Sequence, residues 1–178
     1  ESTVTISVND KYVSPFINQC GITSSNLWNR SSLLQIGNWN EDLNSSQETD
    51  LMLRLVLKNF NYLVDNKPYT IVRERESGQI SQGNPEKKWL QYINIRLQFL
   101  ENLRKCNLNN YLKYQGIYFD FLMVSIFTLA KYDQTTALKV YNDSIKKEWK
   151  SSGNYGFTKI KVALLKCIGL KSFLSFVK

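Results

Sequence analysis

Histidine is absent from this chain of 178 residues, and cysteine occurs only at Cys20, Cys106 and Cys167. Without histidine and without a closely spaced cysteine pair, the sequence excludes the usual zinc sites. An odd number of widely separated cysteines argues against a disulfide framework and favours a protein of the reducing cytoplasm. The first residues contain no basic segment followed by an apolar run, so no signal peptide is expected.

Phosphate-binding motifs and long apolar segments are also absent. The sequence has no D-x-D triplet, no G-x-x-x-x-G-K and no G-x-G-x-x-G, so it encodes no recognisable phosphate cradle. The longest nearly apolar run, residues 117–130, is shorter than the roughly 20 residues needed to cross a bilayer. We therefore expect this run to form a buried helix. The composition, 43% hydrophobic and 21% charged, is that of an ordinary globular protein.

The net charge of +8 is concentrated in the second half of the chain. Residues 1–85 hold 7 basic and 9 acidic side chains, whereas residues 86–178 hold 16 basic and 6 acidic ones. A basic helical tail of this kind favours an anionic partner, either membrane lipid or nucleic acid. A lysine-rich face that is simply solvated is the other interpretation, and composition leaves both open.

Hydrophobic spacing predicts strands in the first half of the chain and helices throughout the second. Gly37 is expected to close the first helix at its C-terminus. Ser45 and Glu48 stand in the S-x-x-E relation of a capping box at the start of the next helix. Strands are expected at residues 3–8, 20–28, 62–65 and 69–73, and helices at residues 30–36, 47–59, 86–106, 117–130, 138–149 and 157–168.

Residues 21–55 carry the most informative pattern. A Gly-Asn-Trp-Asn-Glu turn at residues 37–41 is followed by a helix in which Glu48 stands six positions before Arg54. This order resembles the acceptor-side half of family-two glycosyltransferases of the GT-A fold. The resemblance implies an α/β fold: a partial GT-A-type domain at residues 1–85, then a mostly helical C-terminal subdomain at residues 86–178 with a basic amphipathic end. Because the chain begins with glutamate and not methionine, we expect a fragment whose nucleotide-binding half lies elsewhere.

The resemblance also implies an activity and a catalytic carboxylate. Such an enzyme would transfer a sugar, with inversion, from a nucleotide-diphosphate sugar to a hydroxyl of a surface glycan or lipid-linked acceptor. Glu48 would be the general base, with Asp50 beside it. The alternative is local: Glu48 completes the capping box, and Asp50 interacts favourably with the helix dipole.

Two further groups of residues are candidates for binding. Arg73 and Arg75 match the place where the family binds the donor diphosphate, and the guanidinium fork suits phosphate oxygens. They could instead form an exposed charge ladder with the neighbouring glutamates. The acceptor-binding candidates are Asn26, Trp28, Asn40 and Glu41.

The tryptophans and the arginine of this region also have structural interpretations. Trp28 could stack on a sugar ring or serve only in packing. Trp39 is expected to anchor the turn in the core. Arg54, in the middle of its helix, is expected to pair with a nearby carboxylate or to face solvent.

Cofactor, partners and location follow from the same resemblance. Mg²⁺ or Mn²⁺ would assist departure of the diphosphate, with metal ligands mostly outside this chain. The enzyme would be cytoplasmic, with its basic tail resting peripherally on the inner, anionic membrane face, and nucleic acid is not expected as its partner. The alternative from a different class is a non-catalytic basic helical module that binds a membrane surface or nucleic acid.

Overall fold

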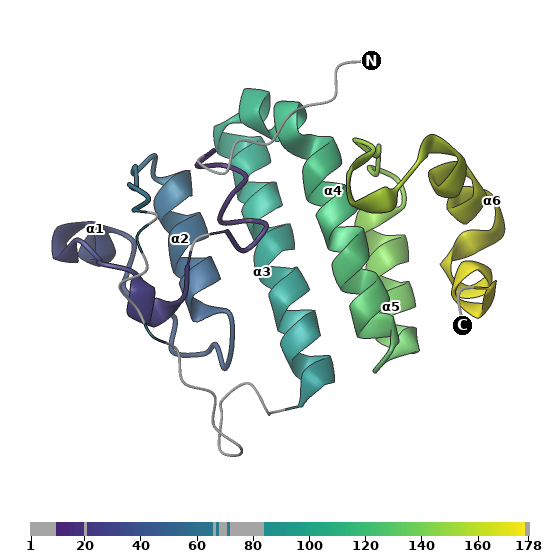
Figure 1. Ribbon diagram of the computed structural model, residues 1–178, viewed down its shortest axis with the longest axis horizontal. Coiled ribbons are helices and arrows are strands. Elements are labelled where there is room, and N and C mark those ends of the chain that lie inside the picture. Colours follow the sequence, from purple (N-terminus) through teal and green to yellow (C-terminus); the bar gives the residue numbers. More distant parts are fainter. Residues whose placement is uncertain (1–9, 20, 66, 68–70, 72–83, 177–178) are drawn as a thin grey trace.

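A computed structural model of the protein describes residues 10–19, 21–65, 67, 71 and 84–176. Within these ranges every regular element is a helix, and the helices follow one another across the molecule in chain order, from α1 at one end to α6 at the other (Figure 1). The elements are η1 (Thr23–Ser25), α1 (Arg30–Gln35), α2 (Gln47–Leu57), α3 (Pro85–Cys106), α4 (Leu108–Ala130), α5 (Gln134–Val140), η3 (Tyr141–Ile145), η4 (Asn154–Gly156) and α6 (Lys159–Phe176).

The prediction of an α/β fold is wrong, because the described part of the chain contains no strand. Two expected strands, at residues 20–28 and 62–65, fall largely within it, and neither forms one. The middle of the first segment forms the short helix η1 instead. Extended backbone becomes a strand only by hydrogen bonding to a neighbouring strand, and within the described ranges the rest of these segments has none. The expected strand at residues 3–8, and residues 69–73 except for Ile71, lie outside the described residues.

The helix predictions around the turn are confirmed. Asn29 precedes α1, and its side chain accepts a hydrogen bond from the Ser32 backbone N–H at 3.1 Å. Gly37 follows the C-terminus of α1 with a φ of +82°, a left-handed conformation that glycine adopts without steric cost. The expected helix at residues 47–59 is α2, which ends two residues earlier, at Leu57.

The predicted capping box at the start of α2 is wrong. Ser46, not Ser45, is the N-cap residue, with a left-handed φ of 58° and no side-chain capping bond. Ser45 is engaged elsewhere: its carbonyl and hydroxyl oxygens accept from the Gln91 side-chain amide on α3, at 2.6 and 3.2 Å. Packing of α2 on α3 therefore sets this helix start, and Glu48 takes no part in a reciprocal cap.

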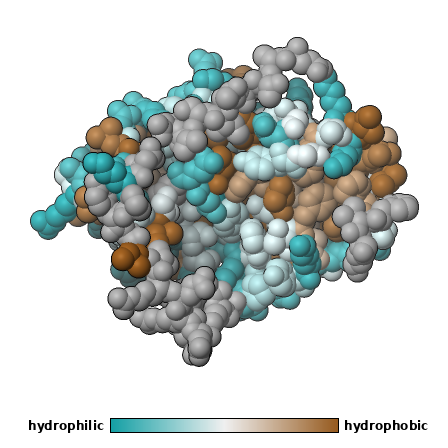
Figure 2. Space-filling model, viewed as in Figure 1, coloured by the Kyte–Doolittle hydropathy of each residue, from teal (hydrophilic) through white to brown (hydrophobic). Residues whose placement is uncertain are grey.

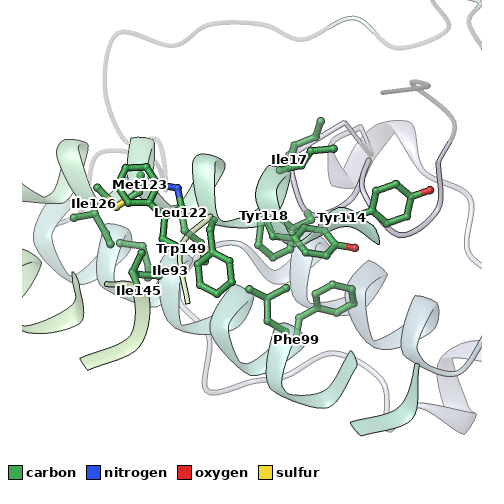
Figure 3. Packing of buried hydrophobic residues seen from close by; sticks show 14 of the residues in the cluster. Ile17, Ile93, Phe99, Tyr114, Tyr118, Leu122, Met123, Ile126, Ile145 and Trp149 are labelled. Atoms are coloured by element: carbon green, nitrogen blue, oxygen red, sulfur yellow. The ribbon is translucent and has the colours of Figure 1, made fainter. Parts of the chain in front are cut away.

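The centre of the molecule is the antiparallel pair α3 and α4. Asn107 alone connects them, and its side chain caps α4 by accepting from the Asn110 N–H at 3.2 Å. The interval expected between the helices at residues 86–106 and 117–130 is therefore reduced to one residue. The apolar run 117–130 lies within α4, and its core-facing side chains are buried as expected. In Figure 3, Ile145 and Trp149 join Met123 and Ile126 in this core.

A buried arginine on α3 fastens residues 10–19 to the helical pair. Arg96 is fully buried, and its guanidinium donates to the Phe16 carbonyl at 2.7 Å, the Asn18 side chain at 2.6 Å and the Tyr92 carbonyl at 2.9 Å. The same group lies 3.5 Å from the centre of the Tyr92 ring. A charge is tolerated in a core only when its donors are satisfied in this way.

A buried carboxylate on α4 fastens the segment that follows η3. Asp120 is fully buried and accepts from the Trp149 indole N–H at 2.9 Å, from the Ser151 hydroxyl at 3.1 Å, and from the backbone N–H and hydroxyl of Ser152 at 2.9 and 2.7 Å. Gly116 makes room for this segment, because a Cβ there would stand 2.9–3.1 Å from atoms of Ser152 and Lys150.

Of the helices in the described ranges, none combines the length and the apolar character needed to span a membrane.

Candidate functional site

Helix α2 carries the residues that the sequence singles out, and two cavities border it. Successive helical residues are rotated by about 100°, so side chains four or seven positions apart share a face. One face of α2 lines a cavity of about 400 Å³ beneath the 37–41 turn, which we call the turn cavity. The opposite face, at Met52 and Leu55, lines a cavity of about 710 Å³ that contains Trp28, which we call the Trp28 cavity.

The turn cavity gathers residues from three parts of the chain. Asn40 and Glu41 of the turn line it, and both side chains are exposed. Helix α3 contributes the polar residues Gln98 and Asn102 to the opposite wall. Asn40 also shapes the turn itself, since its side chain accepts from the Asp42 N–H at 3.1 Å. This cavity therefore combines amide, carboxylate and apolar groups in an open setting.

The floor of the turn cavity is an ion pair within α2. The Arg54 guanidinium donates to one Asp50 carboxylate oxygen through two nitrogens, at 2.9 and 2.6 Å, and to the Ile36 carbonyl at 2.6 Å. The prediction that Arg54 pairs with a carboxylate is confirmed. Because this pair also satisfies the C-terminus of α1, Asp50 holds the turn in place. A catalytic role for Asp50 stays a prediction.

The Trp28 cavity contains buried donor groups without acceptors. The Asn26 side-chain nitrogen and the Trp28 indole nitrogen are both buried, and neither has a hydrogen-bond partner among the residues that the structure describes. The Trp28 ring packs edge-on against Trp39, with ring centres 5.7 Å apart and planes at 78°. Packing therefore accounts for the ring of Trp28 and leaves its N–H unused. Buried donors are normally paired, so these two mark the cavity as a place where a ligand oxygen could bind.

Glu48 stands at the N-terminal end of the face of α2 that lines the Trp28 cavity. Met52 and Leu55 are four and seven positions further on, whereas Asp50 is rotated from Glu48 by about 200°. Glu48 is half-buried and does not itself line either cavity. Its carboxylate makes no hydrogen bond or ion pair with the described residues. Asp50, in contrast, is held in an ion pair with Arg54.

The structure thus divides the predicted site residues into two groups. Asn40, Glu41 and Asp50 meet at the turn cavity. Asn26 and Trp28 meet at the Trp28 cavity, with Glu48 above its α2 wall. Arg73 and Arg75 lie outside the described residues.

Sequence reasoning missed the contribution of α3 to the turn cavity. Gln98 and Asn102 are spaced i, i+4 on a helix whose stripe is otherwise apolar, and this spacing is the signal that could have identified them.

The residues that the structure describes contain no group of three or more histidine, cysteine, aspartate or glutamate side chains that could hold a metal ion. Asp50, a carboxylate of the turn cavity, is paired with Arg54.

Comparison of the chain with family models, with curated proteins and with solved structures finds no match.

Proposed function

We propose that this chain is the acceptor-binding part of an inverting glycosyltransferase resembling family two, with Glu48 as its general base. The observation that carries the proposal is the placement of Glu48. A carboxylate six residues before Arg54 lies half-buried and unpaired at the end of the helix face that lines the Trp28 cavity. The alternative role of Glu48, completion of a capping box, is not used in the structure, because Glu48 takes no part in the cap of α2.

The chemistry requires one proton acceptor at the hydroxyl that attacks. Glu48 would accept the proton of the acceptor hydroxyl while the oxygen of that hydroxyl forms a bond to the anomeric carbon of the donor sugar. The bond from that carbon to the diphosphate oxygen breaks, and its electron pair leaves with the nucleoside diphosphate. Attack opposite to the leaving group inverts the anomeric centre.

The remaining residues are assigned to binding. Asn26 and Trp28 would donate hydrogen bonds to the acceptor, because both have buried N–H groups without partners in the described part of the chain. Asn40 and Glu41 would contact the acceptor from the turn side. Donor binding through Arg73 and Arg75, a glycan or lipid-linked acceptor and a cytoplasmic location remain parts of the proposal that derive from the sequence resemblance.

The test is the Glu48→Gln variant of the protein that contains this chain. Release of nucleoside diphosphate from a panel of UDP-, GDP- and dTDP-sugars would be followed with glycan and lipid-linked acceptors. We expect kcat to fall by at least about 100-fold, the range measured for loss of a general base. Binding of the donor, measured by calorimetry, should be unchanged, because Glu48 acts on the acceptor.

Glu86→Gln is the matched control, since Glu86 is also an acidic residue in the first turn of a helix, α3, and its helix start contributes no residue to either cavity. It should retain full activity. Equal activity of the Glu48→Gln variant and the wild type would refute the assignment of the base. The rival proposal, a non-catalytic helical module, is favoured by the helical architecture of the described residues, and it predicts no transfer by the wild-type protein with any donor.

A further inference from the structure

Helix α6 is apolar on two opposite sides. Towards the protein it buries Val162 and Leu165, which are 9% and 1% exposed. Away from the protein it presents Ile160, Leu164 and Ile168, which are 74%, 51% and 41% exposed. These three residues, spaced i, i+4, i+8, are called the outer stripe below. They lie on the solvent side of the helix, where a surface helix normally carries polar residues.

The outer stripe is not covered by any other part of the described chain. Figure 1 places α6 at one end of the molecule, and Figure 2 shows hydrophobic residues gathered at that end. After Ile168 the helix bends at Gly169, whose φ is +77°, and Leu170 then turns inward and is buried. A helix with apolar residues on all sides is usually enclosed, and a contiguous exposed apolar surface marks a place of interaction.

The charges around the outer stripe are of one sign. Residues 149–176 contain five lysines and no acidic residue. Lys159 and Lys161 adjoin Ile160 on either side, each rotated from it by about 100° around the helix. Lys166 is rotated from Leu164 by about 200° and lies on the side that faces the protein, where its ammonium group donates to the Trp149 carbonyl at 2.6 Å. Lys159 and Lys161 therefore supply the positive charge beside the stripe, which complements an anionic surface.

We propose that the outer stripe of α6 binds the surface of an anionic lipid bilayer, with the helix lying in the plane of the interface. Aliphatic side chains bordered by lysines are the pattern of interfacial helices, in which the apolar residues enter the acyl boundary and the lysines meet lipid phosphates. A second copy of the chain fits less well, because apposed α6 helices would bring lysines together. Nucleic acid would attract the lysines but would leave the stripe exposed. This inference does not depend on the proposed transfer reaction.

The test is cosedimentation of the full chain with vesicles of phosphatidylcholine and phosphatidylglycerol at a ratio of 3:1. We expect binding that weakens when NaCl is raised from 0.1 to 0.5 M, and at least about tenfold weaker binding to vesicles of phosphatidylcholine alone. The double variant Ile160→Gln and Leu164→Gln should lose at least about tenfold in affinity. The matched control is Leu108→Gln with Leu112→Gln, which also changes two leucine-sized residues spaced i, i+4, 51% and 56% exposed, on α4. It should bind like the wild type.

Insertion can be separated from simple electrostatic attachment with a probe on α6. Cys167 is a free, exposed thiol on this helix, and a solvent-sensitive dye attached to it in a Cys20→Ser, Cys106→Ser background should shift to the blue when anionic vesicles are added.

Three results would overturn the proposal. They are the absence of vesicle binding, an equal loss of binding in the Leu108 and Leu112 control, and a stripe-dependent dimer or nucleic-acid complex formed without any vesicle binding.

Discussion

The helical centre of the molecule satisfies its buried charges, whereas the region around α2 leaves buried donors without a partner among the described residues. In the centre, Arg96 and Asp120 are fully buried charges, and each is held by three or more hydrogen bonds. Around α2, the buried nitrogens of Asn26 and Trp28 have no partner in the described part of the chain, and among the uncharged groups of the centre the Tyr141 hydroxyl has none either. The apolar side chain of Leu63, in the same region, is 99% exposed.

This difference separates scaffold from candidate site. A buried polar group without a partner costs free energy, so the two nitrogens beside the Trp28 cavity are places where a ligand atom could bind favourably. The α3–α4 pair needs no such partner for its buried charges, whereas the α2 region still has free donors and bare apolar surface. The two regions should therefore respond in opposite ways to removal of their polar groups.

The largest effect is expected from Asp120→Ala. Four donor groups would lose their acceptor inside the core, and we expect a loss of about 4 kcal/mol in the free energy of unfolding. For a chain of this size the melting temperature should fall by roughly 10 °C. Asp120→Asn keeps one acceptor oxygen and should recover part of the loss. Calorimetry measures the stability of both variants. An Asp120→Ala protein as stable as the wild type would show that Asp120 does not stabilise the fold.

Trp149→Phe tests one bond of the same network. The variant removes the indole N–H that donates to Asp120 at 2.9 Å and leaves a small void beside Phe157, whose ring contacts that of Trp149. We expect a loss of about 2 kcal/mol in urea-induced unfolding. A value below about 0.5 kcal/mol would show that the buried bond contributes little.

Arg54→Met tests the floor of the turn cavity. The ion pair with Asp50 is partly exposed, with the two side chains 27% and 12% accessible, so solvent screening limits its value, and we expect a loss of about 1 kcal/mol. Hydrogen exchange should accelerate most in α1, because the Ile36 carbonyl loses its donor. Arg104→Met is the control: its pair with Glu148 is more exposed, at 57% and 42%, and its removal should change stability less.

The smallest effect is expected from Trp28→Phe. The ring contact with Trp39 is kept, while a buried N–H without a partner is removed, so stability should stay within about 0.5 kcal/mol of the wild type or rise slightly. Urea unfolding beside Trp149→Phe gives the direct comparison. If both substitutions cost the same, the contrast between the two regions does not hold.

The helices of this protein could be predicted from the sequence because their signals are local. The apolar run at residues 117–130 gives the correct end of α4 but misses its first nine residues, and Gly37 gives the end of α1 to within two residues. The strands expected at residues 20–28 and 62–65 were wrong, because a strand does not have a local signal of this kind. Alternating residues show only that one side of a segment is apolar, and whether residues 20–28 pair with another strand depends on chain far away in the sequence.

In the candidate site, only the relations between residues of the same helix could be predicted from the sequence. The two-residue spacing of Glu48 and Asp50 already places these carboxylates on opposite faces of a helix. The part played by Gln98 and Asn102 was not predictable, because it depends on how α2 packs on α3. The same holds for Asp120, whose hydrogen-bond partners lie about thirty residues away, and for Ser45, which Gln91 removes from the predicted capping box.

The single residue between α3 and α4 has a consequence for how this fold tolerates insertions. Asn107 ends α3 and caps α4, so there is no loop between these helices that could accommodate an added residue. One extra residue within the first turn of α4 would turn the rest of that helix by about 100° and advance it by about 1.5 Å. Tyr118 and Asp120 would then point away from their partners. The one-residue connection therefore fixes the rotation of α4 relative to α3. Insertions and deletions should destabilise the protein more here than in its longer connecting segments.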